Sequence, residues 1–275
     1  MKKVILIVAT CITVLCIQFG CSSKSRASIS ATCNAYLGYM SDTLWKYCDI
    51  DGFKVDGFKM IPLVKLNDNV LQPDEFDAAA GYFWFSSEVP WLNLGSEYEL
   101  KVDYGEGDAH AKVTMPGQFT ITRPDSTYVL PKGSDLSVTW GSSTGAEWYW
   151  VYVDGYYYYV NKSGQTRHFD LELDTIMTGT ELVLKADRLF PADVDSIIYG
   201  NGMADVEANS GPKIEGGSKG NIEGDAVGFF WCNFSPRSVC FYIGRPWPCP
   251  RVDLEGTVRA RRLEARRRFV AENSE

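Results

Sequence analysis

The stretch E-Y-E-L-K-V-D-Y at residues 97–104 alternates a charged side chain with an apolar or aromatic one at every step. Successive side chains of a β-strand point to opposite faces, so this period predicts a strand with one buried and one solvated face. The stretch H-A-K-V-T-M at residues 110–115 repeats the alternation, and turn-forming residues separate the two. The sequence therefore predicts a β-hairpin.

Similar signals extend toward the N-terminus. Apolar runs at residues 58–66 and 82–85 are separated by stretches rich in Asn, Asp and Pro. Together with the hairpin they predict an antiparallel, immunoglobulin-like β-sandwich over residues 29–116.

A second series of short strands follows Pro116 and Gly117. Leu136, Val138 and Trp140 alternate with polar residues, and turn signals recur throughout residues 117–244. The glycine-rich stretch 211–228 is expected to complete this second sandwich as a hairpin or to form an extra ribbon at its edge. We thus predict an all-β chain of two tandem immunoglobulin-like antiparallel β-sandwiches, with an N-terminal signal segment and a C-terminal basic helix.

The second series resembles a known domain family. The stretches F-T-I-T-R-P at 119–124, L-P-K-G at 130–133, L-S-V-T-W at 136–140 and W-Y-W-V-Y-V at 148–153 are similar to the pattern of fibronectin type III and related immunoglobulin-like domains of bacterial surface lipoproteins. The resemblance implies a core position for Trp140. It specifies a fold far better than a function.

The first 20 residues are typical of a secretory signal peptide. Lys2 and Lys3 precede a run of apolar residues too short to span a bilayer. Gly20 and Cys21 resemble the end of the bacterial lipobox, although Gln18 replaces the usual Leu. The resemblance implies export, a lipid on Cys21, a tether over residues 21–28, and a cell-envelope location at the outer membrane or cell surface. The alternative is ordinary cleavage that leaves Cys21 unmodified.

The cysteines outside the signal fit an exported chain. Cys33 and Cys48 are a candidate disulfide at the start of the first sandwich. Cys232, Cys240 and Cys249 lack a fourth ligand and the usual zinc spacing, so no metal site is expected. If Cys21 is lipidated, five cysteines remain and one stays unpaired.

The last residues differ in composition from the rest. Nine arginines follow residue 236 and only four precede it, and residues 254–271 have the composition of a helix. Residues 245–275 therefore form an Arg-rich helical tail in our prediction. Three interpretations of this tail stay open. Its arginines could form the solvated face of a helix, or a basic arm that binds anionic lipid, acidic polysaccharide or the acidic body of the chain. Alternatively, the tail is the product of a reading-frame change or assembly error after about Gly244.

Composition argues against several function classes. The formal net charge of −8 disfavours nucleic acid as a partner, and only two histidines are present. The sequence contains neither G-x-S-x-G nor H-E-x-x-H, and its glycine-rich stretch lacks a phosphate-binding motif, so neither an enzyme nor a cofactor is expected.

Aromatic residues give the best candidate site. Trp148, Trp150 and Tyr152 share one face of a predicted strand, and Tyr156 and Tyr158 share one face of the next predicted strand. These five residues are the candidate binding strip, since Tyr and Trp rings bind sugars and proteins well. The alternative is that both faces of the strand are covered.

We therefore predict a non-catalytic cell-surface lipoprotein that acts as a binding or structural module for a glycan or surface protein. Its membrane contact would be the N-terminal lipid. The alternatives are a secreted polysaccharide-active enzyme with an unidentified carboxylate pair and a passive surface spacer.

Overall fold

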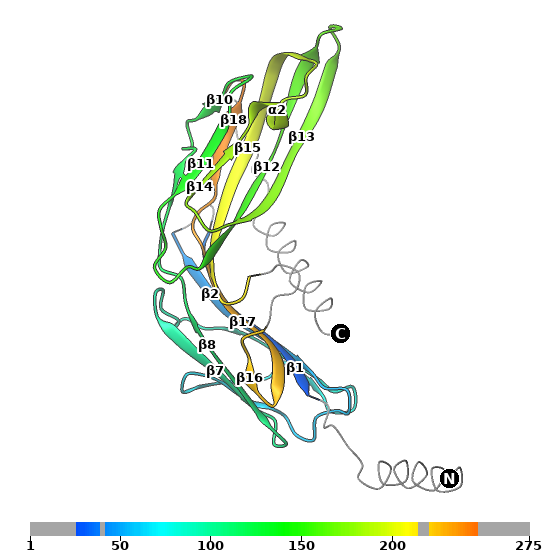
Figure 1. Cartoon of the computed structure of the whole chain (residues 1–275), viewed down its shortest axis with the longest axis vertical. Coiled ribbons are helices and arrows are strands. Elements are labelled where there is room, and N and C mark those ends of the chain that lie inside the picture. The colour runs from blue at the N-terminus through cyan, green and yellow to red at the C-terminus, as the bar shows by residue number, and fades with distance from the viewer. Residues whose placement is uncertain (1–25, 39–41, 214–219, 247–275) are drawn as a thin grey trace, which may run out of the picture.

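A computed structural model describes residues 26–38, 42–213 and 220–246, which form an elongated, curved body of β-strands (Figure 1). Among these residues the single helix is α2 (Ala186–Leu189), one turn long. The predicted all-β fold is confirmed. The signal peptide, Cys21 with most of its tether, and the tail after Pro246 lie outside the described residues.

The described strands form three sheets. The largest has ten strands and runs through both ends of the molecule, and the other two pack on one of its faces (Figure 1). We call it the long sheet. Its strands are β1 (Ala27–Leu37), β2 (Leu44–Phe53), β5 (Glu75–Asp77), β6 (Tyr82–Glu88), β10 (Val129–Leu130), β12 (Trp148–Asn161), β13 (Thr166–Met177), β15 (Val194–Ser210), β17 (Ala226–Ser235) and β18 (Val239–Ile243).

Each smaller sheet forms one lobe with part of the long sheet. The first lobe contains the five-stranded sheet of β3 (Leu63–Leu66), β4 (Asn69–Leu71), β7 (Glu97–Asp103), β8 (Asp108–Thr114) and β16 (Glu223–Gly224). The second contains the three-stranded sheet of β9 (Ile121–Arg123), β11 (Leu136–Trp140) and β14 (Glu181–Leu184). The predicted hairpin is β7 with β8, in which Leu100 lies opposite Ala111 and both are buried.

The lobes share strands, which the division at residue 116 did not anticipate. Strand β17 pairs in parallel with β1 of the first lobe, and its end pairs with β15 of the second. Strand β18 then continues along the same edge of β15. Because of the pairing with β1, residues 226–235 lie in the first lobe. The sequence does not predict this pairing, because long-range strand pairing leaves no mark on local alternation.

The glycine-rich stretch makes this return possible. It contributes β16, which adds a ribbon to the edge strand β8, and then enters β17. Gly228 has φ +140°, and a Cβ there would lie 1.8 Å from the carbonyl oxygen of Ile29 on the neighbouring strand. Only glycine fits so close an approach of two backbones.

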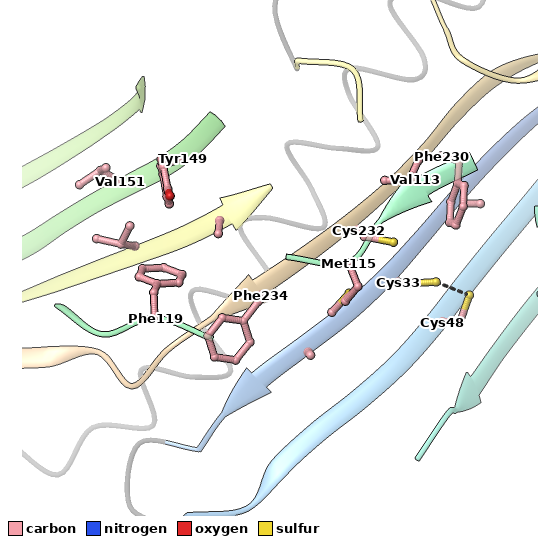
Figure 2. Packing of buried hydrophobic residues seen from close by; sticks show 14 of the residues in the cluster. Cys33, Cys48, Val113, Met115, Phe119, Tyr149, Val151, Phe230, Cys232 and Phe234 are labelled. Carbon is pink, nitrogen blue, oxygen red and sulfur yellow. Dashed lines mark hydrogen bonds between the residues drawn. The ribbon is translucent and has the colours of Figure 1, made fainter. Parts of the chain in front are cut away.

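One apolar core runs through the joint between the lobes. The Phe119 ring lies 5.7 Å from the Tyr149 ring and 5.7 Å from the Phe234 ring, and Trp140 packs on Tyr149 (Figure 2). Trp140 is buried, as the resemblance implied. Because aromatic side chains from the linker and both lobes interlock, the joint is a packed interface.

Candidate binding face on the long sheet

The five residues of the candidate binding strip lie on one face of β12. Their neighbours Tyr149, Val151 and Val153 point to the core, so the strip lies on the opposite side of the long sheet. We call this side the outer face. Trp148, Trp150 and Tyr152 are only 0%, 8% and 8% exposed, whereas Tyr156 and Tyr158 are half-buried. The structure thus brings the five residues together but buries the first three.

The buried end of the strip belongs to a tryptophan cluster. Trp148 and Trp150 pack with Phe229 and Trp231 of β17. The Trp148 indole donates to the Gly211 carbonyl at 3.1 Å, and the Trp231 indole donates to the Pro212 carbonyl at 2.7 Å. The cluster is therefore closed at one edge by the chain that leaves β15, and its polar N–H groups are satisfied.

Carboxyl groups surround the other side of this cluster. In the strand register, Tyr152 lies between Asp205 of β15 and Asp174 of β13, and Trp150 lies opposite Glu207. Trp150 donates its indole N–H to the Asp174 carboxylate. We define the acidic field as five outer-face carboxyls of β12, β13 and β15 that lie toward the tryptophan cluster: Asp154, Glu172, Asp174, Asp205 and Glu207. A further outer-face carboxyl, Asp170, lies opposite Tyr156 and beside His168.

The distal end of the outer face carries a second aromatic group. The rings of Tyr158 and His168 are 4.9 Å apart, and those of Tyr158 and Tyr199 are 5.1 Å apart. Tyr156 packs on the edge of Tyr158. The Arg245 guanidinium lies 6.0 Å from the centre of the Tyr199 ring, within the range of a cation–π contact.

The first lobe adds an aromatic row that sequence reasoning missed. Tyr36 of β1 and Trp45 and Tyr47 of β2 lie on the outer face. The Tyr36 and Tyr47 rings are 6.1 Å apart at 13°, and the Trp45 and Tyr47 rings are 6.5 Å apart at 8°. Trp45 is 40% exposed, so the row reaches the surface at this end, whereas Tyr36 and Tyr47 are half-buried. The W-K-Y spacing at residues 45–47 was the available signal.

Polar groups lie beside the aromatic row. The Asn34 amide donates to the Asp49 carboxylate at 3.4 Å, and the Ser86 hydroxyl donates to the same carboxylate at 2.6 Å. Asn233 of β17 donates to the Asn34 side chain at 2.7 Å. This line of side chains connects the aromatic row to the centre of the long sheet with groups that both donate and accept hydrogen bonds.

Three cysteines lie on the core side of the long sheet, on β1 and β2, which carry the aromatic row, and on the neighbouring β17. Cys33 is opposite Cys48 on one side and Cys232 on the other (Figure 2). The Cys33 and Cys48 sulfurs are thiols 3.3 Å apart. Burial raises the pKa of Cys33, while the hydrogen bond with Cys33 and burial raise the pKa of Cys48. The structure brings the candidate disulfide partners together, and their oxidation stays a prediction.

A charged network fixes the turns at the other end of the first lobe. The buried Lys54 ammonium donates to Asp56 at 2.7 Å, to the Gly57 carbonyl at 3.1 Å and to Glu106 at 3.3 Å. Lys59 also pairs with Glu106. Lys59 and Lys54 lower the pKa of Glu106, and the hydrogen bond from Lys54 lowers that of Asp56. The network ties the β7–β8 turn to the loop after β2.

Within the described ranges, no group of three or more His, Cys, Asp or Glu side chains is arranged to hold a metal ion. No helix in this part of the chain is long and apolar enough to cross a membrane.

No family model matches the sequence, and no curated protein matches it. Among solved structures, the chain is similar to fibronectin(III)-like modules of CbhA from Clostridium thermocellum. The identity is 13%, the match covers 79% of this chain and 93% of that chain, and the TM-score is 0.27.

Proposed function

We propose that the chain is an exported, non-catalytic binding module of a bacterial cell envelope. The signal-like residues 1–20 and the lipobox-like Gly20-Cys21 pair support export and lipid anchoring. The two lobes, each resembling in layer architecture the immunoglobulin-like sandwich expected from the sequence, give an elongated body with a packed joint. Such a body holds a binding face at a fixed distance from its anchor.

The proposed ligand is inferred from the aromatic row. Its three rings are near-parallel, its Trp45 is exposed, and the polar side chains of Asn34 and Asp49 lie on the same face. Aromatic faces stack on the apolar faces of sugar rings at low entropic cost, while amide and carboxylate groups bind hydroxyls. A glycan is therefore the ligand that the row fits best.

Glycan-array binding by the chain from residue 22 onward tests this proposal. Trp45→Ala and Tyr47→Ala should each weaken binding roughly tenfold, or about 1.4 kcal/mol. Phe53→Ala is a matched control, because Phe53 is an exposed aromatic residue on the same strand and outside the row. No glycan binding by a folded chain would contradict the proposal, and a protein ligand captured through Trp45 would identify the other partner class.

The acidic field favours one second candidate, a polysaccharide-active enzyme. Glycoside hydrolysis needs two carboxyl groups on either side of the scissile bond, and this field gathers five on three neighbouring strands. Turnover of an array-positive glycan would support that candidate if Asp154→Asn or Glu172→Gln abolished it. Saturable binding without turnover would support the non-catalytic module.

A further inference from the structure

The middle of the outer face is buried without a described layer over it. Asp205 and Glu207 are 3% and 2% exposed, and Trp148 is fully buried. The described strands all belong to the long sheet or to the two sheets on its other face (Figure 1). Residues 211–212 reach only the edge of the tryptophan cluster.

The chain leaves its last described strand toward this face. Strand β18 runs beside β15, and two residues after it the Arg245 side chain lies over Tyr199 on the outer face. The sequence continues from residue 247 to residue 275. The eight residues 246–253 can span at most about 26 Å when extended, enough to cross several strands.

The remaining segment is complementary to the face in charge and length. Residues 254–271 contain six arginines and two glutamates, opposite the five carboxyls of the acidic field. A helix of this length would extend about 27 Å, close to the roughly 26 Å that β12 rises from Trp148 to Tyr156. Helical spacing would place Arg259, Arg262 and Arg266 on one side with Phe269.

We infer that residues 254–271 of this chain dock across the outer face, between the aromatic row and the distal tyrosines. The arginines bind the acidic field, because a guanidinium pairs with carboxylates even where water is excluded. The apolar side chains cover the tryptophan cluster. The segment thus acts as an intramolecular strap across the middle of the long sheet, while Trp45 at the end of the aromatic row stays 40% exposed.

The docking can be tested with a chain that carries Trp247→Phe, its form truncated after Pro246, and a synthetic peptide of residues 247–275 with the same substitution. All tryptophan fluorescence then comes from residues outside the segment. Truncation should raise acrylamide quenching of tryptophan fluorescence, and the peptide should restore the lower value. Binding of the peptide should weaken about tenfold when the salt concentration rises from about 0.05 M to 0.5 M, because ion pairs at the rim are screened. A scrambled peptide of the same composition is the control.

If the truncated chain does not fold, a second variant tests the docking in the Trp247→Phe chain from residue 22 onward. This variant combines Arg259→Glu, Arg262→Glu and Arg266→Glu. It should raise tryptophan quenching while circular dichroism keeps its β-sheet spectrum. Glu97→Gln and Glu99→Gln, on the smaller sheet of the first lobe, should leave peptide binding unchanged. Unchanged quenching in the triple variant, or equal binding of the scrambled peptide, would overturn the inference.

Discussion

The tryptophan cluster and the aromatic row lie on the same face of the same sheet, yet they differ in exposure. Trp148 and Trp231 are buried and their indoles donate to backbone carbonyls, whereas Trp45 is 40% exposed beside hydrogen-bonding side chains. Both regions read as alternating aromatic residues in the sequence. Residue type and alternation therefore place an aromatic side chain on one face of a sheet, whereas the residues that pack over that face decide whether the side chain is accessible to a ligand.

The largest expected effect contrasts a tryptophan from each region. Trp148→Ala should lower the free energy of unfolding by about 3–5 kcal/mol, because it leaves a cavity and an unpartnered carbonyl at Gly211. Trp45→Ala should cost no more than about 1 kcal/mol, since its side chain is already part-solvated. Urea denaturation followed by circular dichroism measures both values. A similar loss of unfolding free energy in the two variants would contradict the distinction between a buried tryptophan cluster and an exposed aromatic row.

A smaller effect separates the two sides of β1 and β2. Cys33 and Cys48 are 15 positions apart in the sequence, so a disulfide between them would close a short loop. It should stabilise the folded chain by about 3 kcal/mol. Because these cysteines face the core and the aromatic row faces outward, glycan affinity should not change. Denaturation and array binding with and without reductant check both statements. Loss of binding on reduction of a folded chain would instead couple the two sides.

Acid should destabilise the first lobe through its charged network. Glu106 and Asp56 have pKa values lowered by lysine partners, so they bind fewer protons in the folded than in the unfolded chain. Their stabilising contribution is therefore present above the unfolded pKa values and is lost as the pH falls through the folded ones. Glu106→Gln should flatten the dependence of melting temperature on pH in the acidic range. If the melting temperature of Glu106→Gln varied with pH in parallel with that of the unmodified chain, the network would make no measurable contribution to stability.

Local alternation was sufficient for part of this structure. It predicted the β7–β8 hairpin and the two faces of β12, because the period of two is a direct consequence of strand geometry. It could not predict that β17 would pair with β1, because that register depends on side chains far apart in the chain.

The site was harder to predict than the fold for a related reason. Tyr36 joins Trp45 and Tyr47 only after two strands pair, so their row has no compact sequence motif. The burial of Trp148 and Trp150 depends on what packs over the outer face, which alternation does not specify. Exposure depends on tertiary packing, so the sequence could place these aromatic residues on strand faces but could not show which of them are buried.

Titration of a glycan identified on the array into three purified chains tests the central claim most directly. The account predicts that Trp45→Ala weakens binding about tenfold, while Trp150→Phe, which alters the buried cluster, stays within about twofold of the unmodified chain. Melting curves should show the reverse order, with the larger loss in Trp150→Phe. Weakened binding in Trp150→Phe together with unchanged binding in Trp45→Ala would contradict the account and place the binding surface on the tryptophan cluster.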